Sequence, residues 1–243
     1  MDTATAKALL QSDDVAKLRK EAISLQNYNT DSSDEEEQIL KLQLLLWNRI
    51  LQLSASAPDA EKAEIYVSSG NVWMRMGDNE RASGQLQKAL ALQKSVGDCI
   101  AIVKTLQLLG QAAVNSSDYG AATEYHQKAI AELVNNNEQQ SELALAYSQL
   151  ASVFEVQSEF ATALQWIDKA TDIYDKIGSD KEDEIVAVVE AQRGTLQEKL
   201  GEYEQAVVSL SKAHNALLKT RGEDHPRTQE ISFLLEMARS LVD

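Results

Sequence analysis

The sequence predicts an all-α protein: a right-handed superhelical α-solenoid of antiparallel helix pairs, with about 11 helices in all. The composition favours helices, because 44% of the 243 residues are hydrophobic while only 2 are proline and 10 are glycine. β-branched and aromatic residues form no alternating runs, which argues against strands. A motif of alanine followed by Lys-Ala six and seven residues later also recurs 40, 41 and 43 residues apart, starting at Ala82, Ala122, Ala163 and Ala206.

Each recurrence is predicted to be the second helix of a helix–turn–helix unit. A small residue lies twelve positions before each leading alanine and allows the two helices to approach closely. These residues are Gly70, Gly110, Ala151 and Gly194. A short turn is predicted between the two helices of each unit, where a glycine can end the first helix and an aspartate beside it can cap the second. The turns are Gly77-Asp78, Ser117-Asp118, Ser158-Glu159 and Gly201-Glu202.

This arrangement resembles the tetratricopeptide repeat (TPR) family over roughly residues 60–220. One copy matches with Leu106, Leu109, Gly110, Tyr119, Ala122 and Ala129, and the next with Tyr147, Leu150, Ala151, Phe154, Phe160, Ala163 and Ala170. The period exceeds the usual 34 residues or so, as in the long-repeat, kinesin-light-chain-like subclass. The segment Gly222–Thr228 is similar to the linker of that subclass. We interpret it as structural: Asp224 can cap a helix and Pro226 fits a first turn.

The boundaries of the parts follow from this register. Residues 1–57 are predicted to form an N-terminal helix pair, a degenerate repeat or cap packed on the first repeat. The stretch 39–53 within it is apolar nearly all round and should be covered on two sides. Residues 58–221 are predicted to form four repeats, at about 58–96, 97–137, 138–179 and 180–221. Residues 222–243 should form a capping helix, with an apolar stripe made of Ile231, Leu234, Leu235, Ala238, Leu241 and Val242.

Charge and targeting signals limit the classes of partner. The formal net charge is −15, which disfavours nucleic acid, because phosphates would be repelled, and fits a basic partner segment. The sequence has no apolar stretch of 18 residues and no secretory signal at its start, so no membrane span is expected. The single cysteine, Cys99, indicates a reducing, cytoplasmic location.

The sequence shows no catalytic, cofactor-binding or metal-binding pattern. The three histidines, His126, His214 and His225, have no Cys or acidic partner at metal-ligand spacing. No glycine loop for phosphates is present, and the many carboxylates are typical of a solvated helix face. We therefore expect a protein that is not an enzyme.

The TPR resemblance implies that the first helices of the repeats line a concave groove. The inward residues would be Val67, Asn71, Met74, Arg75, Lys104, Leu108, Gln111, Asn115, Ser148, Gln149, Ser152, Glu155, Ala191, Gln192, Thr195 and Lys199. Asn71, Gln111, Ser152 and Thr195 would form a polar ladder able to hydrogen-bond an extended peptide, although an ordinary hydrated face is an equal alternative. A carboxylate clamp is not expected, because Val67 stands where the family has lysine.

The sequence thus predicts a non-catalytic scaffold for protein–protein interaction. Its partner would be a protein or peptide bound through the polar groove, with a basic segment as a candidate. The alternative is a constitutive subunit of a larger assembly, docked through the convex face or the N-terminal helices. A third hypothesis is an enzyme with its active site in the groove. The oligomeric state stays open.

Overall fold

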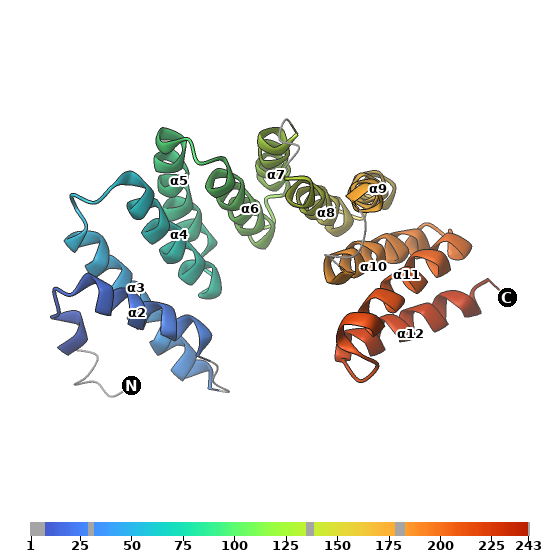
Figure 1. Cartoon of the computed structure of the whole chain (residues 1–243), viewed down its shortest axis with the longest axis horizontal. Helices are drawn as coiled ribbons and strands as arrows, with labels where there is room; N and C mark the ends of the chain where they lie inside the picture. The colour runs from blue at the N-terminus through green and yellow to red at the C-terminus, as the bar shows by residue number, and fades with distance from the viewer. Residues whose placement is uncertain (1–7, 29–31, 135–138, 178–182, 243) are drawn as a thin grey trace. The chain divides into compact units, whose positions relative to one another are not determined.

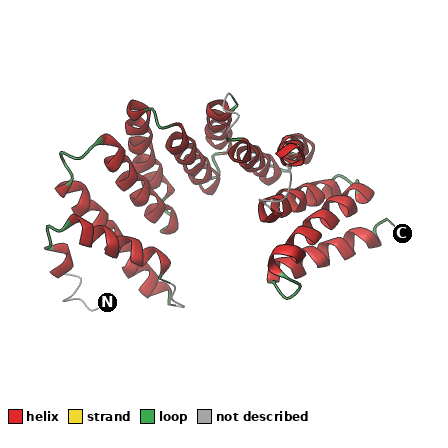
Figure 2. Cartoon of the chain, in the orientation of Figure 1, coloured by secondary structure: helices red, strands yellow, loops and turns green. Residues whose placement is uncertain are grey.

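The computed structural model describes residues 8–28, 32–134, 139–177 and 183–242. Within these ranges the chain forms helices joined by short turns, and no strand is present (Figure 2). The predicted all-α class is therefore confirmed. The chain divides into two compact units, residues 1–125 and 126–243, which are described separately below. The division falls within helix α7 (Tyr119–Leu133).

The first unit contains α2 (Val15–Ser24), the short 3-10 helix η1 (Leu25–Asn27), α3 (Ser33–Leu53), α4 (Asp59–Arg75), α5 (Asn79–Val96) and α6 (Cys99–Asn115), followed by the start of α7 (Figure 1). Helix α3 packs against both α2 and α4, as the apolar stretch 39–53 predicted. Its side chains Leu46, Trp47 and Ile50 are buried in this contact, whereas Leu45 is 52% exposed. The N-terminal helices therefore share one core with α4.

The second unit contains α8 (Gln140–Val156), α9 (Phe160–Ile177), α10 (Asp183–Lys199), α11 (Tyr203–Arg221) and α12 (Pro226–Ser240), preceded by the end of α7 (Figure 1). Each of these helices packs on the next one along the chain, from α8 to α12. The repeated alanines lie at these contacts and have no exposed surface: Ala163, Ala170, Ala206 and Ala213. Their small size lets the helix axes approach, as the repeat motif predicted.

The small residue of each first helix is needed where two helices cross. A Cβ atom added to Gly70 would lie 2.8 Å from Cγ of Leu86, and one added to Gly194 would lie 2.7 Å from Cγ of Leu210. Such distances are shorter than van der Waals contact between carbon atoms. The crossings of the 58–96 and 180–221 segments therefore have the same close geometry.

The turns between paired helices use one left-handed residue each. It is Gly77 (φ 77°) and Gly201 (φ 78°) in two turns, and Ser117 (φ 59°) and Ser158 (φ 62°) in the other two. After Gly77, the carboxylate of Asp78 accepts a hydrogen bond of 3.0 Å from the backbone N–H of Arg81. Asp118 accepts one in the same way from Ala121, also at 3.0 Å. The expected aspartate caps are therefore present.

Two expectations at the C-terminal end were wrong. The cap of α12 is His225, whose Nδ1 accepts from the N–H of Arg227 at 3.3 Å, because the chain enters the helix one residue later than a cap at Asp224 would require. Pro226 does occupy the first turn. The predicted apolar stripe is buried at Ile231, Leu235 and Ala238, but α12 ends at Ser240, so Leu241 and Val242 lie beyond the helix and are exposed.

The fourth repeat carries a glutamate, Glu190, at a position that the repeat pattern keeps apolar. The side chain of Glu190 is buried, and its carboxylate pairs with Lys212 of α11 at 3.1 Å and with Arg193 at 3.9 Å. A buried carboxylate is tolerated when cations compensate its charge. The departure from the pattern is therefore accommodated by an ion pair between α10 and α11.

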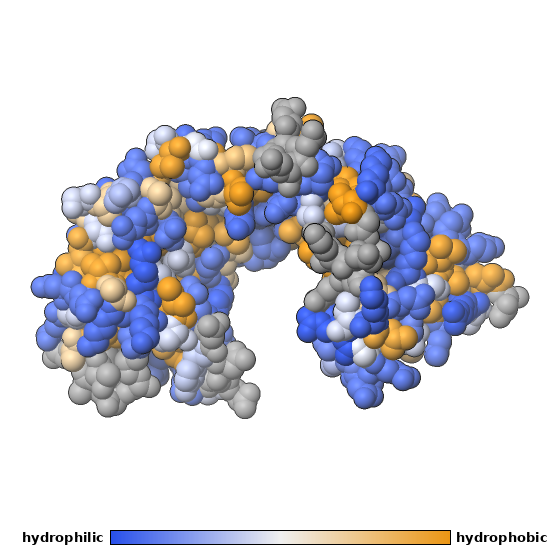
Figure 3. All heavy atoms as spheres, in the orientation of Figure 1, coloured by the Kyte–Doolittle hydropathy of each residue, from blue (hydrophilic) through white to orange (hydrophobic). Residues whose placement is uncertain are grey.

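Hydrophilic residues cover most of the face shown in Figure 3, and separate apolar patches interrupt them, including one near the C-terminus. Among the helices that the structure describes, none combines the length and the apolar character needed to cross a membrane.

Candidate functional site

The polar residues predicted for the groove of the second unit face one another across two helices. Here α8 and α10 come first in their predicted pairs, and α12 is the capping helix that follows the last pair. We call the face that these three helices form the first-helix face. The hydroxyl of Ser148 on α8 donates to Oε1 of Gln192 on α10 at 2.8 Å. The Nε2 of Gln192 donates to Oγ of Ser152 at 2.9 Å and lies 3.4 Å from Oε2 of Glu155. Lys199 pairs with Oε1 of Glu155 at 2.8 Å.

These contacts join α8 to α10 as a continuous polar network, which we call the α8–α10 network. Ser148 is buried within it, and the Glu155 side chain is only 23% exposed. The Ser152 hydroxyl also donates to the carbonyl of Ser148 at 3.2 Å, and that of Thr195 donates to the carbonyl of Ala191 at 3.0 Å. In the second unit, the hydroxyl donors of the predicted polar ladder, Ser152 and Thr195, are therefore already used inside the protein.

Gln149 was also predicted to face the groove. Its side chain is half-buried, and its Oε1 atom is buried with no hydrogen-bond partner. The residue takes no part in the α8–α10 network. The structure thus brings together Ser148, Ser152, Glu155, Gln192 and Lys199, and leaves Gln149 outside this group.

In the first unit, the predicted groove residues lie on α4 and α6 and interact much less. Val67, Asn71, Met74 and Leu108 are half-buried, and Lys104 is exposed. Arg75 turns to α3, where it pairs with Glu36 at 3.3 Å. Gln111 donates to Asn115 on the same helix at 2.9 Å, and Asn115 reaches Oδ1 of Asn79 on α5 at 3.5 Å. Within the described part of this unit, no hydrogen bond or ion pair joins these residues of α4 and α6, so no network comparable to that of the second unit forms.

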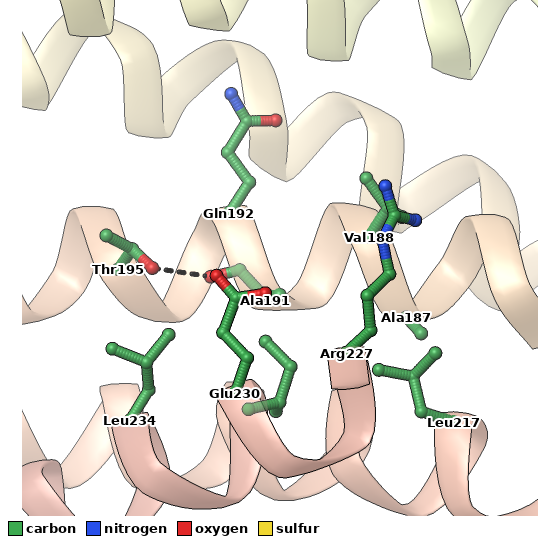
Figure 4. Close-up of a pocket in the computed structure, with 10 residues that line it drawn as sticks. Ala187, Val188, Ala191, Gln192, Thr195, Leu217, Arg227, Glu230 and Leu234 are labelled. Atoms are coloured by element: carbon green, nitrogen blue, oxygen red, sulfur yellow. Dashed lines mark hydrogen bonds between the residues drawn. The ribbon is translucent and has the colours of Figure 1, made fainter. Parts of the chain in front are cut away.

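A pocket of about 220 Å³ lies between α10 and α12 on the first-helix face. Figure 4 shows its lining side chains, with Arg227 and Glu230 of α12 reaching toward α10. Gln192 and Thr195 stand on α10 beside it. The floor is apolar and consists of Ala187, Val188, Ala191, Leu217, Ile231 and Leu234.

Two charged residues at this pocket were missed by sequence reasoning. Arg227 and Glu230 are exposed, and neither forms an ion pair with any residue that the structure describes. They flank the apolar stripe of α12, one turn apart. Their position beside Ile231 and Leu234 could be read from the sequence. That they line a pocket could not, because this depends on how α12 is placed against α10.

The arrangement is suited to binding by shape, apolar contact and hydrogen bonds. Within the described ranges, no group of three or more His, Cys, Asp and Glu side chains is placed to hold a metal ion. His126 belongs to α7, where burial lowers its pKa to about 4. Its Nδ1 atom is buried and has no hydrogen-bond partner. The location in a helix core makes His126 a packing residue.

Comparison with known proteins places the fold. No family model matches the chain, and no curated relative matches it. Among solved structures, BtubC from P. vanneervenii aligns at 16% identity with a TM-score of 0.67, over 93% of this chain and 84% of that one. Aspartyl phosphate phosphatase F from Bacillus subtilis aligns at 14% identity with a TM-score of 0.73, over 98% of this chain. The alignment covers only 59% of that protein.

A third structure, YrrB, is described as a TPR protein with an unusual peptide-binding site. It aligns at 18% identity with a TM-score of 0.52, over 98% of both chains. Identities this low establish the fold and nothing more. The chain thus has a TPR-type fold of stacked helix pairs, as its sequence predicted.

Proposed function

We propose that this chain is a non-catalytic scaffold for protein–protein interaction, and that its second unit binds an extended peptide segment along the first-helix face. The observation that carries the proposal is the α10–α12 pocket, which has an apolar floor and unpaired charges at its rim. The likeness to a TPR protein with a peptide-binding site supports it.

The pocket has a size and chemistry that suit one peptide side chain. A volume of about 220 Å³ holds one aliphatic or aromatic group, and burying such a group contributes about 1.5–3 kcal/mol. Arg227 offers hydrogen-bond donors to a peptide carbonyl or carboxylate, and Glu230 offers acceptors to an N–H or an amine. An extended peptide presents such groups alternately with its side chains.

The α8–α10 network supports the same proposal from the other side of α10. Because Gln192 is held by Ser148 and Ser152, one wall of the binding face is ordered before a peptide arrives. An ordered wall loses less side-chain entropy on binding. The peptide would therefore contact the α10–α12 pocket and the outer surface of the network, rather than replace the hydrogen bonds within it.

The wider setting is proposed on the sequence alone. The repeat spacing of 40 to 43 residues supports the long-repeat, kinesin-light-chain-like subclass. The net charge of −15 supports a basic partner and disfavours nucleic acid. The single cysteine supports a reducing, cytoplasmic location.

The peptide proposal is tested by selecting phage-displayed peptides on the full chain and measuring their affinity by calorimetry. Val188 lines the pocket and is 45% exposed, so Val188→Asp should fold and weaken binding by about tenfold or more. Val208 of α11 is 59% exposed and lies away from the pocket, so Val208→Asp is the matched control. Equal affinity of the two variants would contradict the proposal.

A constitutive subunit of a larger assembly is the second candidate function. Ile23 on α2 and Leu45 on α3 are 46% and 52% exposed, and these apolar side chains would form the docking face on the N-terminal helices. A partner that co-purifies in fixed stoichiometry, and is lost on Leu45→Glu but kept on Val188→Asp, would favour this function over peptide capture.

A further inference from the structure

A second pocket lies on the opposite side of α12 from the α10–α12 pocket. It has a volume of about 450 Å³ and lies between α11, α12 and the loop that joins them. Its lining residues on α12 are Thr228, Gln229, Ser232, Phe233 and Glu236, and those before α12 are His214, Leu218, Glu223 and Asp224. A helix of 3.6 residues per turn places this set of α12 residues about half a turn from Arg227, Glu230 and Leu234. The two pockets therefore use different sides of the same helix.

Large apolar side chains are exposed at this second pocket, which we call the α11–α12 pocket. Phe233 is 62% exposed and Leu218 is 42% exposed, and both line it. Met237, one turn after Phe233 on α12, is 41% exposed. Single exposed apolar residues are common on protein surfaces, but an adjacent group at a concave site indicates an interaction surface.

The charged side chains that line this pocket are all acidic. The lining includes the carboxylates of Glu223, Asp224 and Glu236, and it includes no lysine or arginine. None of the three carboxylates forms an ion pair with a residue in the described ranges. Thr228, in the wall of the pocket, also keeps a buried hydroxyl without a hydrogen-bond partner.

From this combination we infer that the α11–α12 pocket docks a basic amphipathic helix of a partner protein. The apolar stripe of such a helix would cover Phe233, Leu218 and Met237, in the manner of a further helix packed on the end of the stack. Lysine or arginine residues beside that stripe would meet Glu223, Asp224 and Glu236. Charge complementarity of this kind speeds association and selects the partner.

The same charges argue against other occupants. A second copy of this chain carries the same net charge of −15, so its approach to an acidic pocket is opposed by repulsion. Nucleic acid and anionic lipid surfaces are negatively charged and are repelled in the same way. The inference does not rest on the peptide proposal, because that proposal uses the other side of α12.

The test uses the full chain and a synthetic amphipathic peptide of about four helical turns, with leucine on one face and lysine on the other. Binding is measured by fluorescence anisotropy at low and physiological salt. One control peptide replaces lysine by glutamate, and another replaces leucine by serine. The variants are Phe233→Ser and the double variant Glu223→Lys/Glu236→Lys. The matched controls are Val208→Ser and Glu204→Lys, which change exposed residues of α11 outside the pocket.

We expect the lysine peptide to bind the wild-type chain, and to bind each pocket variant at least about tenfold more weakly. Binding should weaken as salt rises, and the control variants should bind like the wild type. Circular dichroism verifies that each variant is folded. No binding of the lysine peptide at low salt, or equal binding of the glutamate peptide or by the pocket variants, would overturn the inference. Sedimentation that shows a wild-type dimer abolished by Phe233→Ser would also overturn it, in favour of a second copy.

Discussion

Each of the two units contains a helix crossing of the same kind, but the units differ in the polar side chains of their first helices. In both, a glycine lies against a leucine at the crossing: Gly70 against Leu86 in the first unit, and Gly194 against Leu210 in the second. In the second unit Gln192 links α10 to α8 through side-chain hydrogen bonds. In the first unit, the amide of Gln111 on α6 remains exposed and bonds within its own helix.

This difference separates the two roles that polar residues play at repeated positions. Where the side chains bond across repeats, they fix the spacing of neighbouring first helices and so shape a binding surface. Where they bond within one helix, they keep the surface hydrated and add little to the packing. A shared repeat therefore determines the crossing, while the polar positions decide how rigid the face is. Three experiments probe the crossings and the polar positions, in order of decreasing expected change in stability.

The largest change in stability is expected at His126. This residue occupies the repeat position that Leu86 has in the first repeat and Leu210 has in the fourth. Its pKa is about 4 in the folded protein, because burial disfavours the charged imidazolium, and about 6.5 in the unfolded chain. As pH falls through this range, the unfolded state takes up the proton first. Stability should be unaffected above pH 6.5 or so and fall by about 3 kcal/mol by pH 4. Urea denaturation across this range measures the loss.

His126→Leu should remove that part of the acid sensitivity, because leucine cannot be protonated. The carboxylates titrate in both proteins, so the difference between variant and wild type isolates the histidine. His214→Gln is the control, because the His214 side chain is only half-buried. If His126→Leu and wild type lost stability in parallel from pH 7 to 4, His126 would not be buried uncharged.

A smaller effect is expected at the crossings. Gly194→Ala gains helix propensity but places a Cβ atom 2.7 Å from Cγ of Leu210, so we expect a net destabilisation of about 1–3 kcal/mol. Gly70→Ala should lose a similar amount, because its contact with Leu86 is equally short. Gly84→Ala is the control: beyond its own stretch of helix backbone no atom lies within 4 Å of the added Cβ, and this variant should gain stability. Denaturation midpoints compare the three.

The 138–179 repeat suggests how to reverse the loss. There Ala151 and Ile167 stand at the equivalent positions, and both are fully buried in one core cluster. The double variant Gly194→Ala/Leu210→Ile should therefore be more stable than Gly194→Ala alone. A double variant no better than the single one would show that the crossing in the second unit cannot accept the Ala–Ile pair.

The sequence predicted the features that depend on near neighbours and missed those that depend on register. Gly77, Asp78 and the small residue Gly70 are recognisable because turns and crossings repeat at fixed local offsets. The network partners Ser148 and Gln192 lie more than one repeat apart, so their contact depends on how α10 is placed against α8. Arg227 was missed for the same reason, since its role depends on the pocket that α12 forms with α10.

The smallest change in stability is expected when one amide side chain is removed from each unit. Gln192→Ala removes the partner of the buried Ser148 hydroxyl, and leaving such a group unsatisfied costs about 1–2 kcal/mol. Gln111→Ala removes an exposed amide that bonds within one helix, so its effect should stay within about 0.5 kcal/mol. Hydrogen exchange of the backbone amides locates the change: Gln192→Ala should lower protection in α8 and α10, and Gln111→Ala should lower it nowhere beyond α6. Equal losses in the two variants would mean that the α8–α10 network adds no rigidity, and the contrast between the units would then be one of surface chemistry alone.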